Sequence, residues 1–177
     1  MDTAIAIIGV VVTAIGTLTA ILAFAEFHTL RQLRKNFEQF EARIRREHFQ
    51  REKAAHRIIA SYQIKDVDQK IGLLQAAISA HPDAFNGYNA LGYAFLEKGD
   101  TAAAMDAFNH AIRQHPDAKE GYFDLAGIHS REGNDDLCIK YLIQAIQVDP
   151  TSKDDLVNDP RFHDLARDDR LKRHMFM

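Results

Sequence analysis

The segment His81-Pro82-Asp83-Ala84 returns further along the chain as His115-Pro116-Asp117-Ala118. A third version, Asp149-Pro150-Thr151, places Pro150 as far beyond Pro116 as Pro116 lies beyond Pro82. A fixed period of about 34 residues, combined with helical patterning, is typical of paired helices that stack into a solenoid. The repeat therefore predicts an all-α body in which each period contributes two helices.

The interior of the best-preserved period alternates small and large residues at helical spacing. It reads Tyr88-x-x-Leu91-Gly92-x-x-Phe95, then Ala104-x-x-x-Phe108-x-x-Ala111, and closes at Pro116. The small residues stand where two helices must cross closely, and the larger side chains fill the space around them. Gly99-Asp100 breaks the chain between the two helices, and Pro116 ends the second helix.

This pattern resembles the tetratricopeptide repeat at every signature position, with aromatic substitutes at the first and fourth. The next period matches more loosely, through Tyr122, Leu125, Ala126, His129, Cys138, Leu142, Ala145 and Pro150. An earlier period is half-recognisable from Leu74, Ala77 and Pro82. The resemblance covers about residues 65–177 and implies roughly two and a half repeats over 59–151, followed by a helical cap over 152–177. Within it Cys138 and His129 are expected to be packing residues.

The N-terminal segment differs in kind from the repeats. Between Asp2 and Glu26 lie 23 uncharged residues, which as a helix span about 34 Å, enough for a hydrocarbon core of about 30 Å. Residues 1–26 are therefore expected to form a single transmembrane anchor. A cleaved signal peptide ending at Ala25 is the alternative, against which stand the long apolar run and the missing basic residues before it.

Basic residues follow the apolar segment and none precedes it. The positive-inside rule then keeps the repeats in the cytoplasm, with the N-terminus outside, and the resemblance suggests a bacterial inner membrane. Small residues recur on one face of this helix at spacings of three and four, which lets two membrane helices approach closely. The expected helix–helix contact consists of Ala6, Gly9, Thr13, Gly16 and Ala20.

Residues 27–58 read as a basic amphipathic neck. Nine Lys/Arg and four Glu lie between His28 and Arg57, a net charge of +5, whereas the chain beyond carries 13 Lys/Arg and 19 Asp/Glu, a net of −6. The apolar stripe comprises Leu30, Leu33, Phe37, Phe40 and Ile44. Two heptads fit an oligomeric coiled-coil stalk, a helix lying on an anionic leaflet, or packing against the next domain. Nucleic-acid binding is not expected, because the acidic body would repel phosphate.

No motif for catalysis, nucleotide binding or a resident cofactor occurs, and no set of residues has metal-ligand spacing. The carboxylates from Asp154 to Asp169 read as helix-start charges and solvated faces. We therefore expect a binding protein, not an enzyme.

In tetratricopeptide domains the first helix of each pair lines a concave groove that holds a peptide or protein segment. By position in the repeat, the resemblance implies that the groove consists of Asn86, Asn89, Tyr93, Leu96, Glu120, Phe123, Gly127, Ser130 and Arg131. Amide side chains suit a peptide backbone, and Tyr93 and Phe123 suit apolar anchors. The sequence thus predicts a membrane-anchored adaptor for an unidentified partner protein; the alternative is a structural subunit held in a larger membrane complex by its transmembrane helix.

Overall fold

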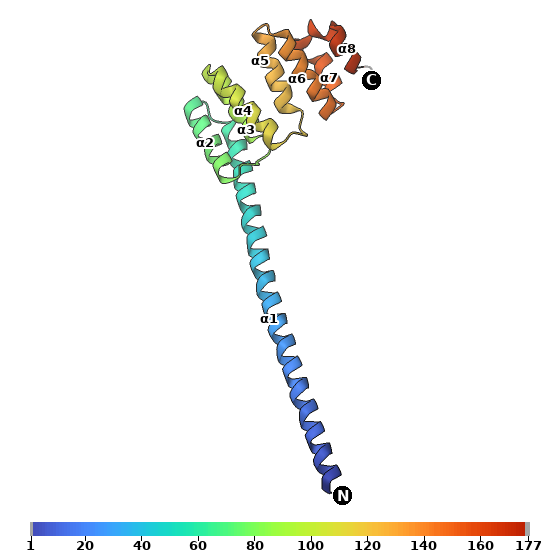
Figure 1. Cartoon of the computed structure of the whole chain (residues 1–177). Helices are drawn as coiled ribbons and strands as arrows, with labels where there is room; N and C mark the ends of the chain where they lie inside the picture. Colours follow the sequence, from blue (N-terminus) through green and yellow to red (C-terminus); the bar gives the residue numbers. More distant parts are fainter. Residues whose placement is uncertain (1, 176–177) are drawn as a thin grey trace. The chain divides into compact units, whose positions relative to one another are not determined.

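The computed structural model describes residues 2–175, and it describes the surroundings of the side chains for residue 7 and residues 9–175. Over this range the chain is helical and has no strand, which confirms the all-α prediction. It divides into two compact units, Met1–His48 and Phe49–Met177. Helix α1 (Asp2–Ser61) contributes residues to both units (Figure 1).

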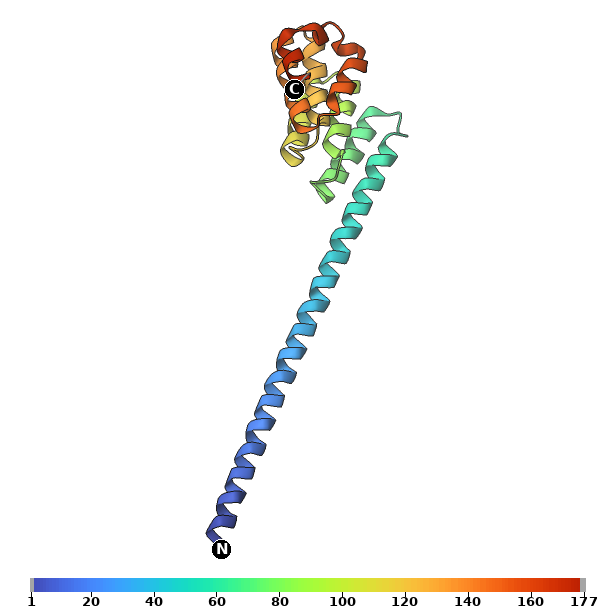
Figure 2. The same ribbon diagram turned by 90° about the vertical axis from the view of Figure 1, so that its right-hand side faces the viewer.

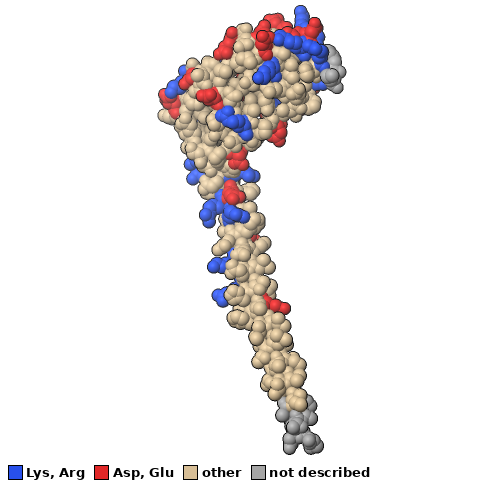
Figure 3. Space-filling view, viewed as in Figure 1, with Lys and Arg blue, Asp and Glu red and all other residues tan. Residues whose placement is uncertain are grey.

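The first unit is a single helix whose side chains from residue 9 to residue 48 are all exposed. Thr13 and Thr19 donate their hydroxyls to backbone carbonyls one turn earlier at 2.9–3.0 Å, and Thr17 does the same at 2.9 Å. A helix that satisfies its own polar groups in this way suits a hydrocarbon environment. Along α1, Lys and Arg side chains lie beyond the uncharged segment that ends at Ala25 (Figure 3).

Among the described residues, one helix is long and apolar enough to cross a membrane, and none of its apolar window is buried. Signal sequences near an N-terminus pass the same criterion of length and composition. The transmembrane span therefore stays a prediction.

The second unit is built of helix pairs. Helix α3 (Gly87–Lys98) pairs with α4 (Thr101–Gln114), and α5 (Glu120–Arg131) pairs with α6 (Asp135–Val148), as both views show (Figure 1, Figure 2). Helix α2 (Val67–Ala80) packs on α3 and shares a core with the end of α1. One period of the sequence, from one proline of the repeat to the next, therefore corresponds to one helix pair.

Local signals in the sequence set the ends of these helices. The side chains of Asp66, Asp100 and Asn134 each accept a hydrogen bond from a backbone N–H three residues on, which begins α2, α4 and α6. Gly99 and Gly133, with φ of 85° and 70°, lie in the turns inside the two later pairs. These left-handed conformations are costly for residues with a Cβ, so glycine favours the turn.

The crossing of α3 and α4 depends on a missing side chain. A Cβ placed on Gly92 would lie 2.7 Å from both Cδ1 and Cζ of Phe108, which is itself fully buried. Ala104 is also fully buried at this contact, and in the following pair the corresponding Cys138 is completely enclosed. Small residues at these positions let large neighbours fill the core at close-packed density.

The C-terminal segment folds back over the last pair. It consists of α7 (Ser152–Asn158), the 3-10 helices η1 (Pro160–Phe162) and η2 (Leu165–Arg167), and α8 (Asp169–Met175). Leu156, Phe162 and Leu171 are fully buried in one cluster with Leu142 and Cys138. The segment predicted as a cap thus covers an apolar face of α5 and α6.

The start of the repeat unit differs from the expected boundary. The sequence predicts a neck over residues 27–58, but the compact unit begins at Phe49. Ala54 and Ile58 are buried at 0% and 5% exposure in the same cluster as Leu74 and Ala77 of α2. Their spacing of four residues places them on one helical face, so the end of α1 acts as the first helix of a pair although it lacks the signature residues.

Candidate functional site

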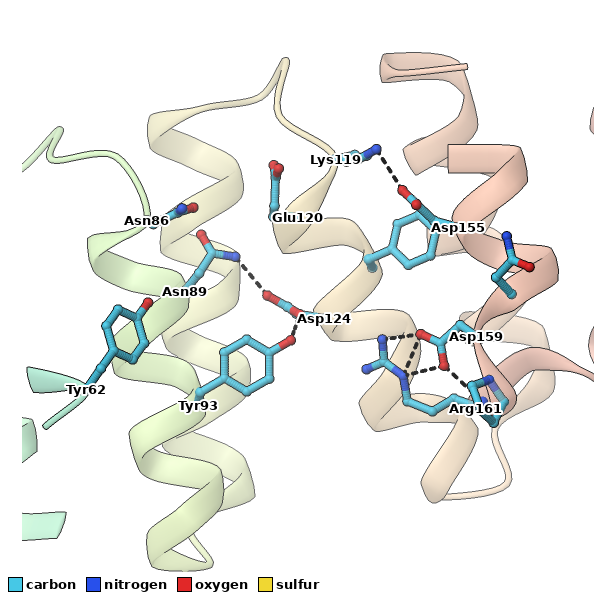
Figure 4. A pocket seen from close by; sticks show the side chains of 13 residues that line it. Tyr62, Asn86, Asn89, Tyr93, Lys119, Glu120, Asp124, Asp155, Asp159 and Arg161 are labelled. Carbon is cyan, nitrogen blue, oxygen red and sulfur yellow. Dashed lines mark hydrogen bonds and ion pairs between the residues drawn. The ribbon is translucent and has the colours of Figure 1, made fainter. Parts of the chain in front are cut away.

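A cavity of about 700 Å³ opens on the face formed by the first helices of successive pairs. Tyr62, in the turn that follows α1, and residues of α3, α5, α7 and η1 all contribute to its wall (Figure 4). The lining residues are Tyr62, Asn86, Asn89, Tyr93, Lys119, Glu120, Phe123, Asp124, Asp155, Asn158, Asp159, Pro160 and Arg161. The volume falls in the range of sites that enclose a side chain or small ligand.

Asp124 lies at the centre of this wall and is only 7% exposed. Its carboxylate accepts a hydrogen bond from Asn89 Nδ2 at 2.8 Å and another from the hydroxyl of Tyr93 (Figure 4). Burial raises the pKa of the Asp124 carboxyl above its ordinary value, although both hydrogen bonds act in the opposite direction. Burial, and then the Asp124 charge, raise the pKa of the Tyr93 phenol, which keeps its proton and donates.

Lys119 joins the start of α5 to α7. Its ammonium lies 2.7 Å from Asp155 Oδ2 and 3.2 Å from Asp149 Oδ2, and it donates to the hydroxyl of Thr151 at 2.8 Å. Two carboxylates therefore neutralise this cation within the described part of the chain. The contact also fixes one rim of the cavity, because it links two elements that line it.

Arg161 occupies the opposite end of the cavity. Asp159 accepts from its Nε at 2.9–3.0 Å and from its Nη2 at 2.6 Å, and this guanidinium holds the pKa of Asp159 below its ordinary value. The hydroxyl of Ser130 donates to the Arg161 carbonyl at 2.8 Å. Gly127 faces the guanidinium so closely that a Cβ there would collide with it. The η1 segment is thus seated on α5.

The predicted groove residues divide into two groups. Five of them line the cavity: Asn86, Asn89, Tyr93, Glu120 and Phe123. The remaining four do not line it.

Leu96 packs beside Phe108 in the core, and Arg131 is exposed at the end of α5. Gly127 and Ser130 face Arg161 instead of open groove, because η1 covers that part of α5. The open part of the groove is therefore shorter than the repeat position alone implies.

Phe123 differs from the expected apolar anchor. It is 8% exposed, and its ring meets the fully buried Phe162 edge-on at 5.8 Å between centroids. Its role in the described structure is to hold the cap, so its replacement would disturb folding. Tyr93, at 50% exposure, and Tyr62, at 64%, present the accessible rings.

Sequence reasoning missed Asp124 and the whole contribution of α7 and η1. Asp124 follows Glu120 by four residues, which places both carboxylates on one face of α5. That spacing was the available signal. Asp155 and Asp159 read as solvated charges in the sequence, whereas each pairs with a cation that lines the cavity.

A second cavity of about 610 Å³ adjoins the first. It lies between the end of α1 and the loop before α3 and shares Tyr62 and Asn86 with the first cavity. Its other lining residues are Arg51, Ala55, Ile58, Ile59, Asp83, Ala84, Phe85 and His115. Asn86 adopts a left-handed conformation with φ of 61° at the junction.

The remaining candidate groups pack inside the repeat unit. Burial raises the pKa of the Cys138 thiol to about 12, which keeps it protonated and poorly nucleophilic. His129 is 5% exposed and stacks on Tyr141 with 5.6 Å between ring centroids. Within the described residues, no group of three His, Cys, Asp or Glu side chains is placed to hold a metal ion.

Comparison with known protein families identifies the repeat type of the helix pairs. Two family models, each described as tetratricopeptide repeat, match residues 90–118 and residues 120–152. No curated protein matches the chain. The matched segments coincide with α3 to α6, whose small-residue crossings and glycine turns are described above. The helical body between residues 90 and 152 is therefore built of tetratricopeptide repeats.

Proposed function

We propose that the chain is a membrane-anchored adaptor that binds a segment of a partner protein in the groove of its repeats. Tetratricopeptide repeats are a protein-interaction fold without chemistry of their own, which suits an adaptor and not an enzyme. The observation that carries the proposal is the cavity of about 700 Å³ on the groove face of the repeats.

The lining of the cavity suits a protein segment. Asn86 and Asn89 bring amide groups that match the donors and acceptors of a peptide backbone. Tyr62 and Tyr93 add exposed aromatic rings, which are the side chains most often found at the centre of protein interfaces. Tyr62 follows α1, Asn86 precedes α3, and Asn89 and Tyr93 lie on α3, so one extended segment can meet them in succession.

The anchor in this proposal is the apolar part of α1. Its described side chains are exposed, and its threonine hydroxyls are satisfied inside the helix. The cluster of Lys and Arg after Glu26 supports a cytoplasmic repeat domain at a bacterial inner membrane, with the N-terminus outside.

Photo-crosslinking tests groove binding directly. A benzophenone amino acid at Tyr62, which is 64% exposed and lines both cavities, is expected to crosslink one reproducible partner in cells. Phe49 is the matched control, because it is a 59% exposed aromatic residue outside both linings. Equal crosslinking from both positions, or none from Tyr62, would contradict a partner in the groove.

The second candidate is a structural subunit held through the membrane helix. Its support is an open face: a Cβ on Gly9 or Gly16 would meet nothing within 4 Å, and Thr13 and Ala20 on the same face are exposed. The side chain of Ala6, the fifth residue expected there, lies outside the described side chains. Homo-oligomers and complexes with other membrane proteins both use such faces.

A further inference from the structure

The two adjoining cavities differ in chemistry but share part of their walls. We propose that they form one site for a partner segment carrying an apolar side chain close to a lysine or arginine, with the cation received by Glu120 and Asp124. This inference rests on the proposed function, because it names the chemistry of the segment that the groove binds.

The first cavity carries more negative than positive charge, and both of its cations are already paired with carboxylates. Its lining contains four carboxylates and two cations. Lys119 is paired with Asp149 and Asp155, and Arg161 is paired with Asp159. Glu120 has no ion pair among the described residues. Asp124 accepts hydrogen bonds from the neutral groups of Asn89 and Tyr93, while the charge of Arg161, which is paired with Asp159, acts on it without a direct ion pair. An acidic ligand would therefore find repulsion, whereas a basic side chain gains attraction.

The chain already places one cation at this wall. Arg161 lines the cavity together with Asp124, and its charge opposes the rise that burial causes in the pKa of the Asp124 carboxyl. Arg161 reaches this position because η1 is fixed on α5 through Ser130 and Phe162. The lining thus already holds one guanidinium, paired with Asp159, and the carboxylate of Glu120, which has no such partner among the described residues, offers the same chemistry to a ligand.

Two accessible aromatic rings line the same cavity. The side chains of Tyr62 and Tyr93 are 64% and 50% exposed. A Lys or Arg head beside such rings gains cation–π attraction in addition to its interaction with carboxylates. Arg and Lys both satisfy this geometry, and the planar guanidinium has the stronger tendency to stack on a ring.

The second cavity supplies the apolar part of the site. Its wall contains Ile58, Ile59, Ala84 and Phe85, and the side chains of Ile59 and Phe85 are 64% and 61% exposed. Covering such surface is favourable because apolar area leaves water. Tyr62 and Asn86 belong to both linings, so a segment that places an apolar side chain here can extend past them into the acidic cavity.

The test uses full-length protein in mild detergent and immobilised peptide mixtures. Three nine-residue mixtures share randomised flanks and differ only at two fixed central positions: Leu-x-Arg, Leu-x-Glu and Ser-x-Arg. The Leu-x-Arg mixture should retain at least about threefold more protein than the other two. Its advantage over Leu-x-Glu should shrink as salt screens the ionic contact, whereas its advantage over Ser-x-Arg, which is apolar in origin, should persist. A peptide copying residues 37–46, in which apolar Phe37, Phe40 and Ile44 lie close to three Arg, represents a second copy of the chain.

Two matched variants test whether the preference for Leu-x-Arg depends on the cavity. Glu120→Gln should reduce retention on Leu-x-Arg about threefold, whereas Asp106→Asn, an exposed acid on α4 outside both linings, should leave it unchanged. Equal losses in the two variants would overturn the site, since they would reflect general charge attraction.

The remaining outcomes separate this inference from the function on which it rests. If Leu-x-Glu or Ser-x-Arg is retained as well as Leu-x-Arg, the groove binds peptides but the ligand chemistry proposed here is wrong. Retention on the 37–46 peptide alone would replace the partner by a contact between copies. If no mixture retains the protein, both the inference and the proposed peptide groove are contradicted.

Discussion

Gly92 is the residue on which the crossing of α3 and α4 depends most directly. An added methyl group would collide with the ring of Phe108, which is fully buried. Gly92→Ala is therefore expected to lower the free energy of unfolding by about 1–3 kcal/mol, the usual cost of overpacking a core. Urea unfolding followed by circular dichroism measures it.

Gly72→Ala is the matched control, because a Cβ at Gly72 in α2 meets nothing within 4 Å. The same change there should be neutral or stabilise by up to about 1 kcal/mol through helix propensity. If both variants unfold alike, the tight crossing is not the reason for glycine at position 92.

The raised pKa of Asp124 predicts how the stability of the protein depends on pH. Because burial raises its folded-state pKa above the ordinary value, the folded protein holds this proton to higher pH than the unfolded chain. Its contribution to stability is therefore present at low pH and is lost as pH rises through the ordinary pKa toward the raised one.

Asp124→Asn cannot ionise and lacks this dependence. The melting temperature of the natural protein should thus fall relative to the variant as pH is raised from about 4 to 7. Comparing the two proteins at each pH cancels the other carboxylates, such as Asp159, whose pKa is lowered instead. A constant difference would show that folding leaves the pKa of Asp124 unchanged, and one with the opposite slope would show that folding lowers it; either result contradicts the prediction.

At the scale of elements, η1 shapes the site by covering one end of the groove. Its anchor is Phe162, fully buried against Phe123. Phe162→Ala should lower the free energy of unfolding by about 3–5 kcal/mol, because it leaves a cavity in a packed cluster. Val157→Ala on the neighbouring α7, where the side chain is 52% exposed, should cost less than about 0.5 kcal/mol. Equally mild effects would mean that the cap does not contribute to the core.

The membrane helix makes a separate prediction at the same scale. If its small-residue face contacts another helix, Gly16→Leu should disrupt that contact by holding the two backbones apart. Val11→Leu, at an exposed position on the opposite face, should leave it intact. Native gels of detergent-solubilised membranes report the difference, and a complex that survives Gly16→Leu would remove the support for the structural-subunit candidate.

At the scale of the whole molecule, the parts governed by the repeat could be predicted from the sequence. The fixed period gives the helix pairs, because Gly99, Gly133 and the prolines interrupt helices at regular intervals. Position within the repeat predicts Asn86, Asn89 and Tyr93 on the groove face, and all three line the first cavity. Each sequence period forms one helix pair, so a single well-matched period predicts the structure of the neighbouring periods.

The parts without a period could not be predicted in this way. The position of η1 on α5 depends on one buried contact, that of Phe162 with Phe123. No periodic spacing in the sequence predicts this contact. Asp124 is buried with hydrogen-bond donors that come from another helix, α3. Its neighbours in the sequence therefore give no sign that it differs from a solvated acid. The first repeat helix reads as part of the neck because no Gly or Pro interrupts the chain between Gly16 and Gly72.

Partner capture by the full-length protein tests the central claim most directly. A tagged protein is purified in mild detergent, and the proteins that accompany it are identified by mass spectrometry. It is compared with a Tyr62→Ala/Glu120→Ala variant, which changes two cavity-lining side chains outside the packed clusters, and with a protein whose residues 1–26 are replaced by another anchor. The groove account predicts that one partner is lost in the double variant and kept after the anchor is exchanged. A partner that persists in the double variant and disappears with the anchor would contradict it and assign the contact to the membrane helix.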